Sequence, residues 1–170
     1  MKIIEAMKKV KGNLQKISDL QEKIKDNSAH LSIETPVYKD ADEKIKGWAQ
    51  SCEDISQENI RLLTAISRTN LETKAVVDLG GKQVTKTVAE WIWRRREYAQ
   101  TDGKTYAVMT DRGLREGVHQ SSTGVDTPVT IIRKYDPELR DKKLGIYRNE
   151  PLAIDATLEV VNAITDLIEV

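Results

Sequence analysis

The stretch IIEAMKKVKGNLQKISDLQEKI, residues 3–24, decides the fold, because its apolar side chains recur every three or four positions. That spacing places one apolar stripe along a helix and is typical of a coiled-coil seam. We therefore predict a helix over 2–26. Its expected seam consists of Ile3, Met7, Val10, Leu14, Ile17 and Ile24, with Gln21 in the gap between the last two and Leu20 widening the stripe.

A second stretch with the same spacing follows the connection 27–39 and predicts a helix over 40–68. Its expected seam consists of Ile45, Trp48, Cys52, Ile55, Asn59, Leu62 and Ile66. Two long helices with matching seams and a short connection are expected to pack antiparallel. Asn59 is polar, and it either fixes the register of the pair or forms the polar wall of a binding cavity.

The pattern changes after residue 70. Gly80 and Gly81 separate two short β-branched stretches and predict a β-hairpin. Thr87 and Glu90 have the spacing of a capping box, which predicts a helix over 88–100. Asp102 and Gly103 are expected to end that helix in a turn.

Helical periodicity is absent from 104–147. We predict strands at 105–110 and 129–135, a mobile polar loop at 111–127, one helical turn at 137–143, and a last helix over 151–168 that packs across the two long helices.

The expected fold class is mainly α: a long antiparallel helical hairpin plus a C-terminal helix, with a small α+β elaboration. We expect a single domain, in which 1–70 forms the helical hairpin, 71–148 the elaboration and 149–170 the packing helix.

Composition excludes several classes of function. Lys and Arg number 27, as do Asp and Glu, so no overall basic excess favours a long nucleic acid. The single cysteine excludes an internal disulfide, and with two histidines it forms no zinc-site spacing. No apolar run is long enough for a transmembrane helix, and no signal peptide is evident, so we expect a cytoplasmic protein without a membrane partner.

Charge is nevertheless unevenly distributed. Residues 79–148 contain 14 Lys or Arg and 9 Asp or Glu, whereas 149–170 contains five acidic residues and no basic one. Either these two segments attract each other, or the basic segment faces an anionic ligand.

The segment WIWRRREY, residues 91–98, is the strongest candidate for a binding site. On a helix of 3.6 residues per turn, Arg95 falls inside the apolar stripe, with Trp91 and Tyr98 on one edge and Arg96 on the other, and Arg94 points more outward. An inward guanidinium needs a carboxylate or an anion as its partner, and the rings suit a stacked base. A salt bridge to the last helix and a phosphate-binding site both satisfy this requirement. An exposed basic face, on a helix placed slightly differently, is the third reading.

Two further pairs are candidates for ligand contacts. Arg68 and Asn70 end the second helix where the basic elaboration begins, although both also suit a helix C-terminus. Arg133 and Tyr135 share one face of a predicted strand, although they also suit a solvated edge.

Some of these residues also carry a family resemblance, through Ile66-Ser67-Arg68-Thr69-Asn70, Gly81-Lys82-Gln83-Val84-Thr85, Val88-Ala89-Glu90-Trp91 and Arg94-Arg95. Over about residues 1–100 the chain resembles small bacterial and phage proteins labelled septicolysin-like. The resemblance implies a mainly helical fold and supplies no activity.

The sequence contains no catalytic signature, nucleophile with a base, or metal set, so we expect neither an enzyme nor a cofactor. The first hypothesis is a non-catalytic, homo-oligomeric protein that binds a small phosphate-bearing ligand. Its concrete form is a phage anti-defence protein that sequesters a nucleotide immune second messenger in the host cytoplasm. The alternative is a helical assembly or protein-interaction module, phage structural or chaperone-like, with no small-molecule ligand.

Overall fold

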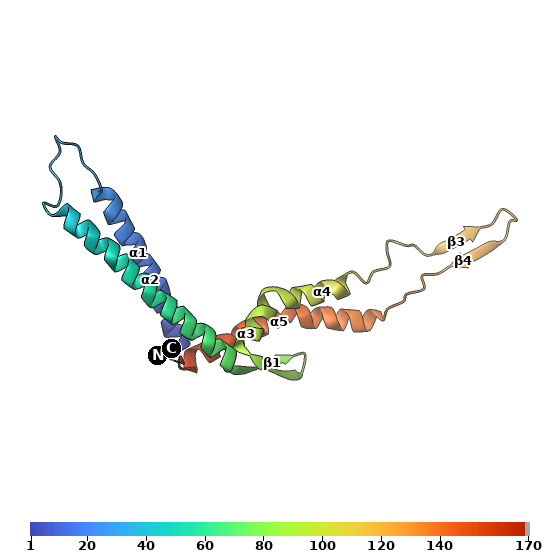
Figure 1. The fold of residues 1–170 in the computed structure, drawn as a ribbon. Coiled ribbons are helices and arrows are strands. Elements are labelled where there is room, and N and C mark those ends of the chain that lie inside the picture. The colour runs from blue at the N-terminus through green and yellow to red at the C-terminus, as the bar shows by residue number, and fades with distance from the viewer. Residues whose placement is uncertain (169–170) are drawn as a thin grey trace. The chain divides into compact units, whose positions relative to one another are not determined.

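A computed structural model describes residues 1–168 (Figure 1). The chain forms two compact units. The first, the coil unit, comprises residues 1–74, 87–89 and the segment from 158 onward; the second, the hairpin unit, comprises 75–86 and 90–157. The mainly α fold class with small antiparallel hairpins is confirmed. The prediction of a single domain stays a prediction.

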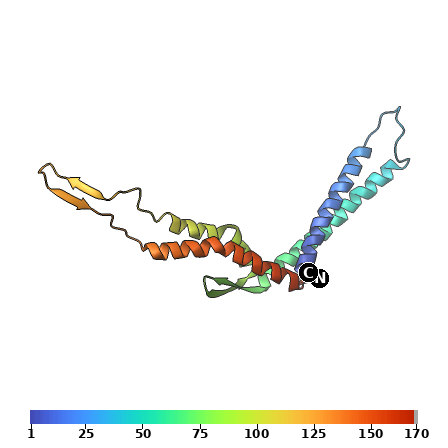
Figure 2. The same cartoon turned by 180° about the vertical axis from the view of Figure 1, so that it is seen from behind.

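In the coil unit, α1 (Ile3–Asn27) and α2 (Ala41–Glu72) pack as an antiparallel pair, and both views show them side by side (Figures 1 and 2). The predicted helical hairpin is therefore confirmed, with α2 about one turn longer than predicted. Its core lies at the end distant from the α1–α2 connection. It consists of Ile3, Ala6 and Ile66, with Leu62 and Leu167 packed against them.

The α2 seam follows the predicted positions, but the predicted α1 seam is wrong at Met7 and Leu14. Met7 and Leu14 remain 50% and 58% exposed, and Gln21 is exposed as well, whereas the residues that precede them are buried or half-buried. Small Ala6 and polar Asn13 occupy the seam, and they do not register as apolar in a periodicity count.

Asn13 enters the seam because it has a polar partner there. Its Nδ2 donates to Asn59 Oδ1 at 2.9 Å and lies 2.8 Å from Glu58 Oε2. Since both amides are almost fully buried, this pair supports the register-fixing interpretation of Asn59.

The end of the chain pairs with its beginning inside the coil unit. Leu167 N–H donates to the Met1 carbonyl at 2.8 Å, and Lys2 Nζ lies 2.7 Å from Asp166 Oδ2. Ile168 N–H donates to the buried hydroxyl of Thr69 at 2.9 Å. The helix predicted over 151–168 therefore ends earlier, at Ile164, and the chain continues in non-helical backbone. The predicted packing segment 149–170 also includes residues 169–170, which lie outside the described residues.

The hairpin unit begins with β1 (Lys74–Leu79) and β2 (Lys82–Thr87), as predicted. Gly80 and Gly81 have φ values of 65° and 86°, and a two-residue type I′ hairpin turn requires positive φ at both of its central residues. A Cβ on Gly80 would also lie 2.9 Å from Ile146, so the turn packs closely against the last helix.

Helical structure then continues further than the sequence predicted. It runs through α3 (Val88–Trp93), the π-helical segment η1 (Arg94–Tyr98) and α4 (Ala99–Ala107). The predicted turn at 102–103 and strand at 105–110 are therefore wrong. Gly103 sits where a Cβ would contact Tyr147 at 3.4 Å, so helix packing outweighs the local turn propensity.

The last helix also has no interruption. α5 (Pro137–Ile164) is continuous through Gly145 and Pro151, so the predicted separate turn and later helix start are wrong. Proline lacks the N–H that continues a helical hydrogen-bond ladder, which is why it suggested a boundary. In both views α5 lies alongside α4 (Figures 1 and 2), and Tyr147 of this stretch lies against Gly103 and Tyr106 of α4, contacts that favour a continuous helix.

The polar segment between α4 and α5 contains a second hairpin. β3 (Gly117–Gln120) pairs antiparallel with β4 (Asp126–Val129), and all eight residues are exposed. The segment predicted as a loop, 111–127, thus contains most of a strand pair. The prediction of a strand over 129–135 is wrong, because β4 ends at Val129. Alternating side chains beyond Val129 indicated a strand, but no partner strand exists there within residues 1–168.

None of the helices within residues 1–168 is both long enough and apolar enough to cross a lipid bilayer.

Candidate functional site: a cationic groove between α4 and α5

The π-helical turn determines which arginine faces inward. In η1 the Ala99 N–H donates to the Arg94 carbonyl, five residues back, so each residue advances around the axis by less than in an α-helix. A projection at 3.6 residues per turn therefore misplaces the side chains here. Arg94 faces inward, whereas Arg95 is half-exposed, the reverse of the prediction.

Arg94 meets two carboxylates. Its Nε and Nη2 each lie 2.7 Å from a Glu150 oxygen, and its Nη1 lies 2.6 Å from Asp102 Oδ2. Glu150 is 0% exposed, so this bidentate contact supplies the partner that a buried carboxylate needs. The hydrogen bond to Glu150 is the main cause that raises the pKa of Arg94 above its ordinary value.

Arg95 forms a more exposed pair with the same helix. Its Nε and Nη2 lie 2.9 and 3.0 Å from the two Asp155 oxygens. Hydrogen bonding to that carboxylate raises the pKa of Arg95. The attraction between the basic segment and the acidic last helix therefore exists as two ion pairs.

Beside these pairs lies an open groove of about 460 Å³. One wall comes from η1 and α4, the other from α5. The lining residues are Arg95, Arg96, Gln100, Gly103, Lys104, Ala107, Leu144, Tyr147, Arg148 and Pro151.

The electrostatics of the groove are one-sided. Arg95, Arg96, Lys104 and Arg148 line it, and no Asp or Glu is among its lining residues. Among residues 1–168, no carboxylate lies within ion-pair distance of Arg96, Lys104 or Arg148. A small anion would therefore meet cations that the rest of the described chain does not neutralise.

Tyr147 supplies an aromatic wall. Its ring centroid lies 5.8 Å from that of Tyr106, and Arg94 Cζ lies 5.9 Å from it. Burial is the largest cause that raises the pKa of the Tyr147 phenol. The ring is thus held in place by neighbours on its own unit and stays a neutral phenol at pH 7.

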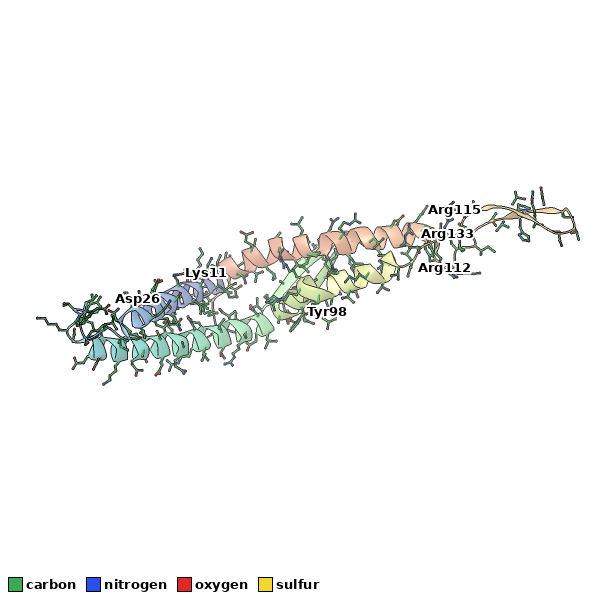
Figure 3. All side chains as sticks on the ribbon, turned by 90° about the horizontal axis from the view of Figure 1, so that it is seen from above. Lys11, Asp26, Tyr98, Arg112, Arg115 and Arg133 are labelled. Atoms are coloured by element: carbon green, nitrogen blue, oxygen red, sulfur yellow. The ribbon has the colours of Figure 1, made fainter. Side chains whose placement is uncertain are left out.

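Of the eight residues predicted to contact a ligand, only Arg95 lines the groove. Trp91 is 0% exposed and its Nε1 donates to the Ala75 carbonyl at 3.0 Å, so its ring cannot stack on a base. Tyr98 is 52% exposed and is labelled in Figure 3, but it does not line the groove. Arg94 is occupied by its two carboxylates.

The other predicted residues lie elsewhere. Arg68 is exposed and lies 3.3 Å from Glu72, and both belong to the coil unit. Asn70, also in the coil unit, is partly buried, and its Oδ1 is buried without a hydrogen-bond partner in the described part of the chain.

Arg133 and Tyr135 brace the base of the β3–β4 hairpin, where Figure 3 labels Arg112, Arg115 and Arg133. Arg133 Nε and Nη2 lie 2.8 and 2.6 Å from the Asp111 oxygens, and the Tyr135 hydroxyl donates to Asp111 at 3.1 Å. The Arg133 contact is the main cause that lowers the pKa of Asp111. These contacts join the segment that precedes β3 to the segment that follows β4.

Sequence reasoning missed most of the groove, although a signal was present. The lining residues of the first wall, from Arg96 to Ala107, recur at helical spacing, as do those from Leu144 to Pro151. Expecting helix breaks at Gly103 and Pro151 concealed both stripes.

No metal site accompanies the groove: within residues 1–168, no three His, Cys, Asp or Glu side chains are placed to hold an ion.

Comparison with known proteins bears only on the fold. No family model matches the chain, and no curated protein matches it. Its fold is similar to the crystal structure of a functionally unknown conserved protein from Corynebacterium diphtheriae, with a TM-score of 0.57 and 17% identity over 99% of each chain.

Proposed function

We propose that the protein binds a small phosphate-bearing ligand, without catalysis, in the groove between α4 and α5. The observation that carries this proposal is the convergence of four cationic side chains on a groove with no acidic lining. Arginine and lysine are the usual partners of phosphate oxygens. The Tyr147 ring and the apolar Leu144 and Ala107 suit a base or another flat group.

The groove itself supports binding rather than turnover. Its lining contains no Ser, Thr, Cys, His or carboxylate, which are the most common nucleophiles and general bases. That the ligand is an immune second messenger, and that the protein counters host defence, stay predictions.

A thermal-shift screen of the full chain against AMP, ADP, ATP and linear and cyclic dinucleotides tests the proposal. A ligand at 100 times its Kd stabilises its site by roughly 2.7 kcal/mol, which is measurable as a rise in Tm. The K104Q/R148Q variant should lose that rise, and added salt should reduce it for the unchanged chain.

The matched control is Lys142→Gln, which removes one charge from the same helix outside the groove. It should retain the full rise in Tm. A screen in which no nucleotide moves the Tm, or in which Lys142→Gln and K104Q/R148Q lose equally, contradicts the proposal.

A second candidate function, assembly through the coil unit, is favoured by one observation. Four large apolar side chains of α1 and α2 remain 49–58% exposed: Met7, Leu14, Ile60 and Leu63. The antiparallel pair does not bury them. Because Met7, Leu14 and Leu63 each follow a seam residue, they share one side of the antiparallel pair. The Lys9–Glu58 ion pair at 2.6 Å, whose members precede seam residues, marks the opposite side.

We infer that a further copy of the coil covers this apolar side, which gives the predicted homo-oligomer. Light scattering should report a mass above that of one chain, and Met7→Lys with Leu63→Lys should return it to the monomer. Lys8→Glu, on the exposed α1 surface, is the control. A mass of one chain at every concentration contradicts this candidate function and does not affect the proposal of ligand binding in the groove.

A further inference from the structure

The cations of the groove are divided into two groups along its length. Arg96 and Lys104 are eight residues apart on continuous helical structure, which corresponds to about 12 Å between their backbones. Arg148 belongs with Lys104, because Gly103 lies against Tyr147 and thereby places Lys104 and Arg148 at neighbouring levels of the two walls. Arg95 belongs with Arg96.

The two groups differ in charge. Arg95 is paired with Asp155, so Arg95, Arg96 and Asp155 together carry one net positive charge. Lys104 and Arg148 have no carboxylate partner among residues 1–168 and carry two. Gln100, one turn from each of Arg96 and Lys104, lies between the groups and contributes a neutral amide.

Apolar and aromatic surface follows the doubly charged group. Ala107 lies one turn beyond Lys104, and Leu144 lies one turn from Arg148 on the facing helix, with Tyr147 between. Along the groove the order is therefore one net charge, a neutral amide, two net charges, and an apolar wall.

We propose that the ligand of this groove carries two separate anionic groups, a terminal phosphate and a more distant single negative charge, as a short phosphodiester-linked dinucleotide does. This inference rests on the proposed function, since it specifies the ligand of the same groove. A mononucleotide satisfies one group only. A diphosphate places both its phosphates beside each other, because a single bridging oxygen joins them, and so cannot reach both groups.

The terminal phosphate binds at Lys104 and Arg148, where two unneutralised cations match its charge at pH 7. The phosphodiester binds at Arg96, and Gln100 contacts the sugar that joins the two. The base nearest the terminal phosphate lies against Tyr147.

Calorimetry with three probes tests the inference: AMP, ADP and the 5′-phosphorylated adenosine dinucleotide pApA. We expect pApA to bind at least tenfold more tightly than AMP, and ADP to resemble AMP. Arg96→Gln should weaken pApA about tenfold and leave AMP unchanged. Lys104→Gln should weaken both, and the control Lys142→Gln neither.

Each result supports or contradicts a distinct statement. If AMP and ADP bind as tightly as pApA, or Arg96→Gln weakens AMP as much as pApA, the two-anion inference is wrong and the phosphate site stands. If all three probes fail to bind the unchanged protein, the two-anion inference fails; the proposed function fails with it only if no nucleotide of the thermal-shift screen raises the Tm. Circular dichroism of each variant should match that of the unchanged chain, and the single substitution Arg96→Lys, which retains the charge, should retain most of the pApA affinity.

Discussion

The two units bury polar side chains in different ways. In the coil unit the amides of Asn13 and Asn59 form a neutral pair inside an otherwise apolar seam. In the hairpin unit the buried group is a carboxylate, Glu150, and two hydrogen bonds from Arg94 satisfy it. A neutral amide that loses its partner costs the energy of one hydrogen bond, whereas a buried charge that loses its partner costs far more.

The difference also separates stability from binding. In the hairpin unit, Arg94 is saturated by carboxylates, and its neighbours on η1 and α4 carry the charges that face the groove. A cluster of three consecutive arginines therefore contains one structural cation, Arg94, one shared cation, Arg95, and one available cation, Arg96. Substitutions can sharpen or break this comparison.

The largest expected effect is that of Arg94→Ala. This substitution leaves the buried Glu150 carboxylate without the charged partner that satisfies it, so we expect a loss of about 3–5 kcal/mol in the free energy of unfolding. Urea denaturation followed by circular dichroism measures it. Arg95→Ala removes a solvent-exposed pair and should lower the free energy of unfolding far less than Arg94→Ala does. Equal losses in the two variants would show that Arg94 contributes no more to the stability of the fold than Arg95 does.

A smaller loss is expected in the coil unit. Asn13→Ala leaves the Asn59 amide without its partner and should cost about 1–2 kcal/mol. Replacing both asparagines with leucine should recover or exceed the original stability, because a well-packed apolar pair needs no hydrogen bond. A double leucine variant that is less stable than Asn13→Ala would contradict this account of the seam.

The pH dependence of the coil unit should be modest and of known sign. Lys9, followed by Asn13, lowers the pKa of Glu58 in the folded chain. A depressed pKa contributes stability above the carboxyl's ordinary range, and that stability is lost as the pH falls through the lowered value. Thermal unfolding of Glu58→Gln should therefore show a weaker Tm decrease below about pH 4.5 than the unchanged chain. An identical decrease in the two proteins would remove Glu58 as its source.

The smallest expected effect on global stability is at the base of the β3–β4 hairpin. Asp111→Asn weakens the contacts to Arg133 and Tyr135, both outside the helical core. Hydrogen exchange should accelerate across 117–129 and stay unchanged in α4 and α5. Acceleration that extends into both helices would show that Asp111 supports the groove as well.

Local patterns predicted the parts of the chain in which sequence neighbours set the structure. The α2 seam, the antiparallel pair and the Gly80–Gly81 hairpin all follow from spacing or from the φ values that glycine permits. The polar position in the α2 seam was visible too. Its partner was not, because Asn13 has no apolar signal and is defined only by Asn59 opposite it.

The same local patterns could not predict the candidate site, because its geometry also depends on contacts distant in the sequence. A constant 100° per residue cannot anticipate a π-helical turn, so Arg94 and Arg95 exchanged roles. Gly103 and Pro151 carry the local signals of helix breaks, yet both lie inside continuous helices, and Gly103 packs closely against Tyr147 of the facing helix. Those two continuous helices create both walls of the groove.

The sequence by itself determined the α2 seam, the first hairpin and the excess of basic residues in the middle of the chain, because each depends on neighbours a few positions apart. Tertiary structure alone decided which arginine is buried, which cations remain unpaired and where they converge. These outcomes depend on contacts between residues more than forty positions apart, such as Arg94 with Glu150 and Arg95 with Asp155, and no local pattern encodes them.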